Sequence, residues 1–512
     1  MRDTPATPAP GRGIGWLVLF LLPTIALAVR HWGWAPREQA GDYAQYLLHA
    51  KALVEGRPYA ETGYLYHPDA WLIGPRAYPP GLPLTLAPIV ALGGVHSPLI
   101  RVLMLLSLGA FAYLAWRRLA MEVEPWQAAA GAGFAAFALE ARGATLAPIS
   151  DPGFAALLWG MVLAVDTATR WSWRRSTAVA VLGGAALAYR LAGVALVGAF
   201  GLFVLFSWKR HRARTVVPFL AWGAAGVAGL AVGLVTPETA TSMLQGTAGL
   251  TSRLGMLVSE YTRAPLEGLL YPTTNGTANL VYHLTAMVLA AVGLVVLGWH
   301  ARRSFLMLTC VVYVAMLLAS PVADTRYVWP LFPVGACALA LGLTRVLEWA
   351  ASRRPAFPSA VTARALTVAV LAAALYTDLR RPRPASLVGR PDTEALFAWL
   401  RETSRSSPMR VVFTNPRVLT LETGVPAMGN VMRSAPGHVL AYDERGITHV
   451  IAEPDPRSDC LQRFANAAIA AYPARFALAY ENQGFRVYRV LPAMGPVDSA
   501  FRRLSWDEVN VC

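Results

Sequence analysis

The chain has 512 residues, of which 55% are hydrophobic and 15% are charged, and its formal net charge is +15. Soluble domains usually carry about 25% charged residues, so the composition argues against an ordinary soluble protein. The positive charge does not indicate a nucleic-acid partner, because the basic residues form short clusters between apolar runs, as they do in the cytoplasmic loops of membrane proteins. We therefore expect a polytopic α-helical membrane protein.

Apolar runs that approach the ~17–25 residues of a helical span recur along the first 380 residues. The first run, 14–29, has no small-residue cleavage site after it, so we interpret it as a retained span and not as a signal peptide. The positive-inside bias places the N-terminus and the basic clusters in the cytoplasm. These clusters are Arg117-Arg118, Arg170 with Arg174-Arg175, 209–214, Arg302-Arg303 and Arg353-Arg354.

The run 177–208 does not fit a single span, because its 32 residues would form a helix about 48 Å long against a hydrocarbon core of about 30 Å. We expect two short helices that meet outside near Arg190. About eleven spans then place the N-terminus in the cytoplasm and everything after Arg380 outside, across a cytoplasmic (inner) membrane. The other predicted spans are 14–29, 98–116, 127–144, 151–168, 216–235, 279–299, 304–320, 327–346 and 361–377.

A long first outer loop, 31–97, follows the first span. Within it, Asp42 precedes an amphipathic helix that Gly56 and Pro58 end, and we expect this helix to lie on the membrane surface. Aspartate is a preferred N-cap residue, which would by itself explain Asp42. The alternative is that a carboxylate at the lipid–water boundary acts as a general base on a lipid-linked substrate.

Further acids are predicted on the same outer side. Asp151 opens a span and is followed by Pro152, so a capping role is again sufficient to explain it. Glu140 lies just before this span. Two or three acids at one membrane face could form an acid/base pair or bind a divalent cation through oxygen ligands. Asp42 and Asp151 are therefore candidates for both kinds of site.

Three outward arginines are candidates for binding a phosphate. Arg190 interrupts an apolar run, where a charge is costly and often functional, although snorkelling to the surface is an alternative. Arg326, with Tyr327 after it, heads a span, and its fork of donors suits a phosphate, although Asp324 could simply neutralise it. Arg76 lies in the first loop. His67 in the same loop could be a ligand or a base, but a lone loop histidine is usually neither.

The tail, 385–512, alternates helical and strand patterns, which predicts a small extracytoplasmic α/β domain after the membrane domain 1–380. The predicted helices are 392–402, one starting at Asn415-Pro416, and 460–472, and the predicted strands are 410–413, 447–454, 475–480 and 485–491. The tail contains no glycine-rich phosphate loop and no nucleophile motif, so we expect a structural or acceptor-docking role.

The four cysteines carry no zinc-binding spacing. Cys310 and Cys337 lie in predicted spans and are interpreted as packing residues. Cys460 and Cys512 lie in the predicted outer domain, where a disulfide is permitted. The sequence does not decide whether they pair.

Four segments, in this order, resemble the GT-C class of glycosyltransferases that use polyprenyl-phosphate sugars. They are GDYAQYLLHAKALVEGRPY from Gly41, AYPPGLPLTLAP from Ala77, ISDPGFAALLWG from Ile149 and TRYVWPLFP from Thr325. The resemblance covers roughly residues 14–346. It is strongest to the bacterial protein mannosyltransferase and aminoarabinose transferase type, a family 39-like branch.

The resemblance implies roles for individual residues. Asp42 matches the catalytic acid of the first loop, Asp151 the second outward acid, and Arg326 the arginine before the tyrosine–proline span. The sequence departs from the pattern at two places. Asp42 has no acidic neighbour, and Tyr78 stands where some members carry a lysine.

The implied reaction is an inverting displacement at the anomeric carbon. Asp42 would deprotonate the acceptor, and Arg326, with Arg76 or Arg190, would neutralise the leaving polyprenyl phosphate. The acceptor could be a lipid, a glycan or a protein, and the sugar and any metal requirement are open. A multi-pass transporter or lipid flippase, and a non-catalytic membrane scaffold, are the alternatives.

Overall fold

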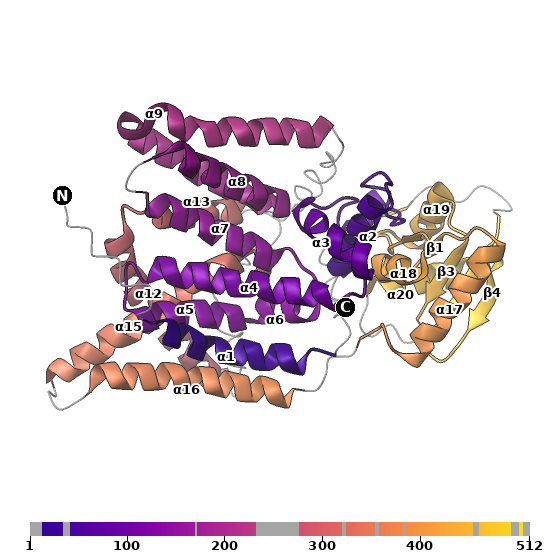
Figure 1. Cartoon of the computed structure of the whole chain (residues 1–512). Helices are drawn as coiled ribbons and strands as arrows, with labels where there is room; N and C mark the ends of the chain where they lie inside the picture. The colour runs from indigo at the N-terminus through magenta and orange to yellow at the C-terminus, as the bar shows by residue number, and fades with distance from the viewer. Residues whose placement is uncertain are drawn as a thin grey trace.

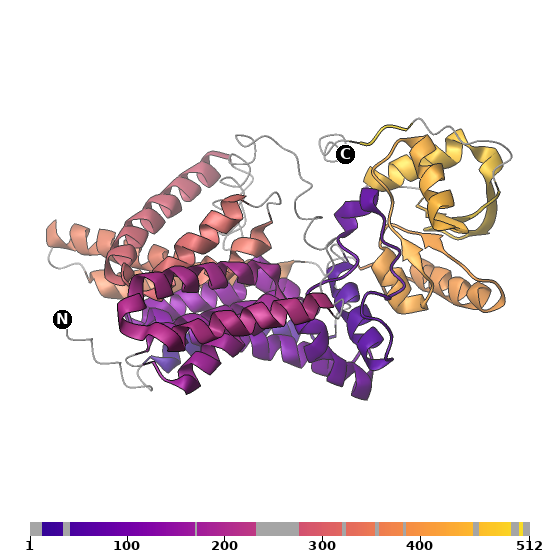
Figure 2. The same ribbon diagram turned by 90° about the horizontal axis from the view of Figure 1, so that it is seen from above.

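The structure is a computed structural model of the chain, and it describes residues 13–33, 41–168, 171–231, 276–319, 324–353, 358–381, 386–453, 460–492 and 501–504. Helices make up the first part of the chain, and the only β-sheet of the described residues lies in the C-terminal part (Figure 1). The first loop lies between these two parts when the molecule is seen from above (Figure 2).

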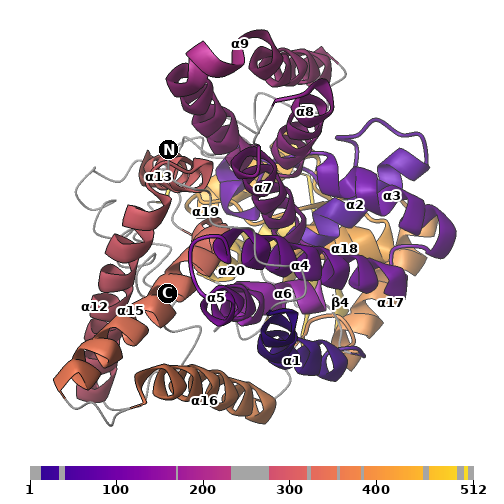
Figure 3. The same ribbon diagram turned by 60° about the vertical axis from the view of Figure 1, so that its left-hand side comes forward.

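The helical part contains twelve α-helices among the described residues outside the first loop, and their lengths range from 4 to 38 residues. Their bounds are α1 Ile14–Arg30, α4 Pro98–Leu119, α5 Pro125–Phe137, α6 Leu139–Leu146, α7 Asp151–Asp166, α8 Trp173–Tyr189, α9 Val194–Ala231, α12 Gly276–Ala301, α13 Phe305–Ala319, α14 Thr325–Val328, α15 Phe332–Arg353 and α16 Ser359–Arg380. Neighbouring helices pack in the order α12, α15, α5, α4, α7, α8, α9 (Figure 3).

Four helices in the described part of the chain are long and apolar enough to cross a membrane. They are Pro98–Leu119, Val281–Ala301, Thr325–Arg353 and Ser359–Arg380. Other apolar helices are shorter, among them α1 with 17 residues and α13 with 15. The predicted total of about eleven spans is therefore not confirmed, although α1, α4, α7, α12, α13, α15 and α16 occupy the predicted positions.

Two predicted spans differ from the structure. The run 127–144 is divided into α5 and α6, because Ala138 has an extended backbone that ends the first helix. The second is the span 216–235, which does not begin a new helix: the basic cluster 209–214 before it lies inside α9 and not between two helices. Arginine and lysine are good helix formers, so charge alone does not end a helix. The predicted break near Arg190 is confirmed, since Arg190 is extended between α8 and the short helix η3, Leu191–Gly193.

Close helix contacts hold the α12, α15 and α5 group together. A side chain on Gly293 of α12 would meet the carbonyl oxygen of Ala338 in α15, so glycine permits this approach. Trp329, in the short helix η4 Trp329–Leu331, is fully buried and donates its indole N–H to the carbonyl of Ala135 in α5 at 2.8 Å. This bond fixes the entry of the chain into α15, and with it the position of α14.

The first loop contains α2 Asp42–Val54, η2 Pro68–Ile73 and α3 Gly81–Gly93. The helix predicted after Gly41 is confirmed, and its expected place on the membrane surface stays a prediction. Nine of its 13 residues are buried, because α3 covers one side and α18, Pro416–Thr423, of the C-terminal part covers another. The apolar face of α2 therefore packs against protein.

The C-terminal part is a five-stranded sheet in the order β2-β1-β3-β5-β4 with helices on both faces. Strands β1 Val411–Val412, β2 Ala427–Met428 and β3 His449–Ala452 are parallel, and β4 Phe476–Glu481 and β5 Arg486–Val490 form an antiparallel hairpin. Helices α17 Pro391–Ser406 and α18 Pro416–Thr423 pack on one face, and α19 Ala435–Arg445 packs on the other. The last helix is α20, Cys460–Ala471.

All helices and strands predicted for the tail are present, and β2 and α19 were missed. The domain boundary itself stays a prediction. Cys310 and Cys337 are free. Whether Cys460 pairs with Cys512, which the sequence left open, lies outside the described residues, because Cys512 is not among them.

The first loop is joined to the sheet. Tyr64 pairs with Ala427 of β2 in parallel fashion, with Leu65 N–H donating to the Ala427 carbonyl at 2.8 Å. Asp69 accepts a hydrogen bond from Arg433 at 2.5 Å. The loop therefore extends the edge of the sheet, and the two parts of the chain meet directly at α2 and α18.

Candidate active site

Asp42 is the first residue of α2 and does not cap it. The capping position is Gly41, whose φ of 65° lies in the left-handed region that glycine adopts readily, and no side chain caps this end. The capping role that the sequence allowed for Asp42 is therefore wrong. Its carboxylate turns instead toward side chains from three other segments.

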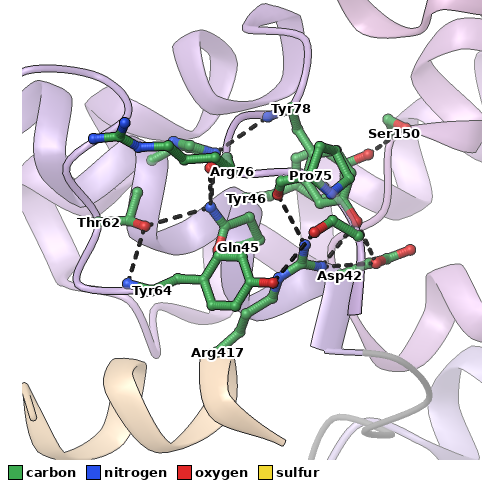
Figure 4. A network of polar contacts seen from close by, with 12 residues as sticks. Asp42, Gln45, Tyr46, Thr62, Tyr64, Pro75, Arg76, Tyr78, Ser150 and Arg417 are labelled. Atoms are coloured by element: carbon green, nitrogen blue, oxygen red, sulfur yellow. Dashed lines mark hydrogen bonds and ion pairs between the residues drawn. The ribbon is translucent and has the colours of Figure 1, made fainter. Parts of the chain in front are cut away.

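Both oxygens of the Asp42 carboxylate are engaged, and Figure 4 shows Asp42 beside Tyr78 and Arg417. Oδ2 accepts a hydrogen bond from Arg326 Nη1 at 3.0 Å. Oδ1 accepts from the Tyr78 hydroxyl at 2.6 Å and from Arg417 Nη1 at 3.2 Å. The Arg417 guanidinium also donates to the Tyr78 hydroxyl at 2.8 Å. Residues more than 280 positions apart thus meet at one carboxylate.

We call the group formed by Asp42 with Tyr78, Arg326 and Arg417 the Asp42 corner. Its electrostatics favour the charged form of the Asp42 carboxylate. Burial by itself raises the pKa of Asp42, but Arg326 and Arg417 lower it, and the resulting pKa lies below the usual value. Burial raises the pKa of Tyr78 well above its usual value, so its hydroxyl stays protonated and donates. The Asp42 side chain is 17% exposed, which leaves it accessible to a substrate.

Arg326 is held by α14. Asp324 precedes this helix, and its carboxylate accepts from the Arg326 backbone N–H and from Nε, both at 2.9 Å. The Tyr313 hydroxyl donates to the carbonyl of Tyr327 at 2.9 Å, which fixes the next residue. With its side chain 31% exposed, Arg326 is shared between two carboxylates and is still open to solvent.

Asp151 and Arg190 form a second aspartate–arginine group, which we call the Asp151 corner. Asp151 is the first residue of α7 after the capping position Ser150, so its predicted capping role is also wrong. Its Oδ1 lies 2.5 Å from Arg190 Nη1 in an ion pair. A side chain on Gly153 would overlap the Tyr189 ring, so glycine lets the end of α8 approach α7 and brings Arg190 to Asp151.

The two corners belong to one network. Arg190 Nη1 donates to the Ser150 hydroxyl at 3.4 Å, and that hydroxyl lies 2.9 Å from the hydroxyl of Tyr46 in α2. The Tyr46 ring stacks on Tyr78 with centroids 5.0 Å apart. The guanidinium of Arg190 lies 5.2 Å from the centre of the Tyr327 ring. Charges of opposite sign balance along this network: Asp42, Asp151 and Asp324 against Arg190, Arg326 and Arg417.

Three predicted residues lie away from this network. Arg76 is exposed and its Nε donates to the Ala60 carbonyl at 3.4 Å; only its backbone carbonyl reaches the site region, where Gln45 donates to it at 3.0 Å. His67 is 3.0 Å from Glu444, so it links the first loop to α19. Glu140 lies in α6, and its side chain is not among those described.

Sequence reasoning missed Arg417 and gave Tyr78 no role. Tyr78 is positioned by its backbone N–H, which donates to His49 at 3.3 Å. Arg417 did carry a signal. It is the second residue of α18, where the helix dipole disfavours a cation, so an arginine at this place indicates a compensating carboxylate elsewhere.

The site fits a divalent cation poorly. Asp42 and Asp151 are each ion-paired with arginine. Among the residues that the structure describes, no group of three or more His, Cys, Asp or Glu side chains lies close enough to hold a metal. The metal site predicted for the two aspartates stays a prediction.

Comparisons by sequence found no matching family model and no matching curated protein. Comparison of folds gave two informative matches. ArnT from Cupriavidus metallidurans, bound to undecaprenyl phosphate, matches with a TM-score of 0.50 at 15% identity, over 94% of this chain and 99% of that one. The archaeal oligosaccharyltransferase AglB from Archaeoglobus fulgidus, in complex with an inhibitory peptide and a dolichol-phosphate, matches with a TM-score of 0.53 at 13% identity, over 95% of this chain and 75% of that one.

Both matches extend over the helical part, the first loop and the C-terminal sheet, since they cover nearly the whole chain. Identity at this level carries the fold and not the substrate. The overall architecture therefore agrees with the resemblance seen in the sequence, and the chain shares the fold of ArnT and of AglB.

Proposed function

We propose that this protein is a membrane glycosyltransferase that moves a sugar from a polyprenyl-phosphate donor to an acceptor at the outer face of the cytoplasmic membrane. The observation that carries the proposal is the Asp42 corner: a partly exposed carboxylate held charged beside an exposed arginine. The fold match to ArnT and AglB supports the donor class, because both solved structures contain a polyprenyl phosphate.

In the proposed reaction the acceptor hydroxyl attacks the anomeric carbon, and its proton passes to Asp42. A new bond forms between the acceptor oxygen and the sugar. The bond from the sugar to the phosphate oxygen breaks, and the polyprenyl phosphate leaves with the electron pair. Attack opposite the leaving group inverts the anomeric centre.

Arg326 connects donor binding to the base. Its guanidinium donates hydrogen bonds to Asp42 and Asp324, and a donor phosphate would compete for the same N–H groups. When the phosphate takes over Arg326, Asp42 loses one of its two cations and its pKa rises, which makes it a better base. The carboxylate is therefore most reactive when the donor is in place.

The proposed topology places the C-terminal part outside, because the positive-inside bias puts the basic clusters in the cytoplasm. Asp42 and Asp151 then face the same compartment. A periplasmic reporter enzyme fused after residue 385 would be active in this arrangement, and activity of a cytoplasmic reporter alone would contradict it.

The test of the base is Asp42→Asn. The amide keeps an oxygen acceptor for Tyr78 but cannot take a proton, so transfer should fall by about 10²–10⁴, the scale for a lost general base. Transfer would be measured in proteoliposomes with a panel of polyprenyl-phosphate sugars, and donor-site integrity by binding of undecaprenyl phosphate, which should be retained.

The matched control is Asp443→Asn, because Asp443 pairs with Arg475 in the C-terminal part away from the site. It should transfer at the wild-type rate. Near wild-type transfer by Asp42→Asn would move the base elsewhere. Movement of donor lipid across the bilayer by wild-type protein, with no transfer from any donor, would favour the flippase alternative.

A further inference from the structure

Arg417 comes from a part of the chain that the sequence assigned to structure or acceptor docking, yet its side chain ends at Asp42. We propose that Arg417 is a positioning residue for the Asp42 base, so that the C-terminal α/β part completes the catalytic centre. This inference rests on the proposed function of Asp42.

The contacts of Arg417 are those of a fixed support. Nη1 donates to Asp42 Oδ1 at 3.2 Å and to the Tyr78 hydroxyl at 2.8 Å, and Nη2 donates to the Pro75 carbonyl at 3.1 Å. The guanidinium carbon lies 4.9 Å from the ring centres of both Tyr64 and Tyr78. Both terminal nitrogens are thus used by the protein itself (Figure 4).

The first loop is shaped around this guanidinium. Gly74 has a φ of 96°, and a side chain there would come within 2.8 Å of Arg417 Nη2 and of the Tyr78 hydroxyl. Glycine is therefore required at this position for both the backbone conformation and the space. The parallel pairing of Tyr64 with Ala427 holds the same loop segment against the sheet that carries α18.

The two arginines at Asp42 differ in access. The Arg417 side chain is 0% exposed, whereas that of Arg326 is 31% exposed. A donor phosphate can reach Arg326 without a rearrangement, but Arg417 lies behind the carboxylate and under the loop. Arg417 therefore suits a permanent structural partner of Asp42, and Arg326 suits an exchangeable one.

This difference assigns different tasks to the two carboxylate oxygens. Oδ1 is fixed by Arg417 and Tyr78, which set the orientation of the carboxylate. Oδ2 is bound to Arg326. It becomes free when the phosphate claims Arg326, so Oδ2 is the oxygen that takes the acceptor proton.

The experiment follows the protonation of Asp42 without requiring transfer. Carbodiimide reacts with protonated carboxyl groups, and peptide mass spectrometry reports the pH of half-maximal labelling at Asp42. In Arg417→Gln this pH should rise by about one unit, because a nearby cation lowers a carboxyl pKa by roughly 1–3 units. In Arg417→Lys, which keeps the charge without the fork, the rise should be smaller.

The matched control is Arg405→Gln, an arginine in the same part of the chain that is 76% exposed and pairs only with Glu402 among the described contacts. Its labelling curve should overlay the wild type. In transfer assays, Arg417→Gln should lower kcat, move the acid limb of the pH profile to higher pH and leave the KM for donor unchanged.

Three outcomes would overturn the proposal. They are an unshifted labelling curve in Arg417→Gln, a loss of transfer with an unmoved acid limb, and a raised donor KM with unchanged kcat, which would make Arg417 a phosphate ligand. If Arg417→Gln does not fold, Arg417→Lys carries the test alone. A shifted labelling curve in a protein that transfers no sugar would sustain the role of Arg417 and refute the proposed function.

Discussion

Two aspartate–arginine corners lie in this molecule, and they are built differently. Asp42 and Asp151 are each the first residue of a helix, and each faces an arginine. Asp42 collects partners from the first loop, from α14 and from the C-terminal part, and it is 17% exposed. Asp151 pairs with Arg190 at the end of the neighbouring helix and is 3% exposed.

The difference separates chemistry from support. A base must reach the substrate and change its charge, which the Asp42 corner permits because one of its two cations is exposed and exchangeable. A closed ion pair at the junction of α7 and α8 does neither. Arg190 contacts Ser150 and the Tyr327 ring, so we infer a supporting role for the Asp151–Arg190 pair, and the proposed proton transfer falls to Asp42.

The largest effect on the stability of the fold is expected at the Asp151 corner. Asp151→Ala leaves Arg190, whose side chain is 15% exposed, without its carboxylate, and breaking a fully buried ion pair in this way costs about 3–5 kcal/mol, which is the upper limit here. Thermal unfolding in detergent should shift strongly downward for this variant. Asp42→Ala, at the more exposed corner, should shift it less.

A double variant sharpens this comparison. Asp151→Ala combined with Arg190→Met removes both charges, so much of the lost stability should return. If Asp151→Ala instead unfolds like the wild type while transfer falls by more than about 10², Asp151 takes part in the chemistry and the distinction between the corners fails.

An intermediate effect, on donor-phosphate affinity, is expected at Arg326. Arg326→Gln removes a charged donor to the phosphate, and hydrogen bonds to charged groups contribute about 1.5–3 kcal/mol. Affinity for undecaprenyl phosphate should therefore fall roughly 10–100-fold. Titration with undecaprenyl phosphate measures this directly.

The control for Arg326 is Arg345→Gln, since Arg345 lies further along the same membrane segment, is 47% exposed and pairs with Glu348. It should bind undecaprenyl phosphate like the wild type. Unchanged affinity in Arg326→Gln would move the phosphate site to another cation, with Arg190 the next candidate.

Much of this arrangement follows from local sequence. The apolar runs indicated most helix positions, and the alternating pattern of the tail indicated α17, α18 and α20 and four of its five strands, but not α19. Glycine and proline mark the ends of helices and strands, and the spacing of apolar residues distinguishes helices from strands. These signals act within a few residues, so a single sequence is enough to find them. Asp42 and Arg326 were found because each stands at the head of a helix beside a recognisable motif.

The rest depends on contacts between distant segments. Asp42 reads as a helix cap in the sequence, and only its meeting with Arg326 and Arg417, 284 and 375 residues away, reveals a different role. Strand β2 has two residues between Pro426 and Gly429, so no extended apolar run marks it in the way that RVVF marks β1. The burial of α2 was missed for the same reason, because an amphipathic helix does not specify whether lipid or protein covers its apolar face.

The smallest effect is expected from a single hydrogen bond in the open corner. The Tyr78 hydroxyl donates to Asp42 Oδ1 at 2.6 Å, and Tyr78→Phe removes this bond while keeping the ring that stacks on Tyr46. Oδ1 keeps its bond to Arg417, so the loss should lie at the low end of the ~1.5–3 kcal/mol of a hydrogen bond to a charged group, and transfer at neutral pH should fall about tenfold. The control is Tyr113→Phe, an exposed tyrosine of α4, which should have no effect.

The same variant tests the sign of the electrostatics. Because the pKa of Asp42 is lowered in the folded protein, its charged form stabilises the fold above its unfolded pKa, and this stability is lost as pH falls through the folded pKa. Tyr78 helps to lower that pKa, so Tyr78→Phe should move both acid unfolding and the acid limb of transfer to higher pH. A shift to lower pH would mean that burial, and not its partners, controls Asp42, and the contrast between an open, charged corner and a closed one would then not hold.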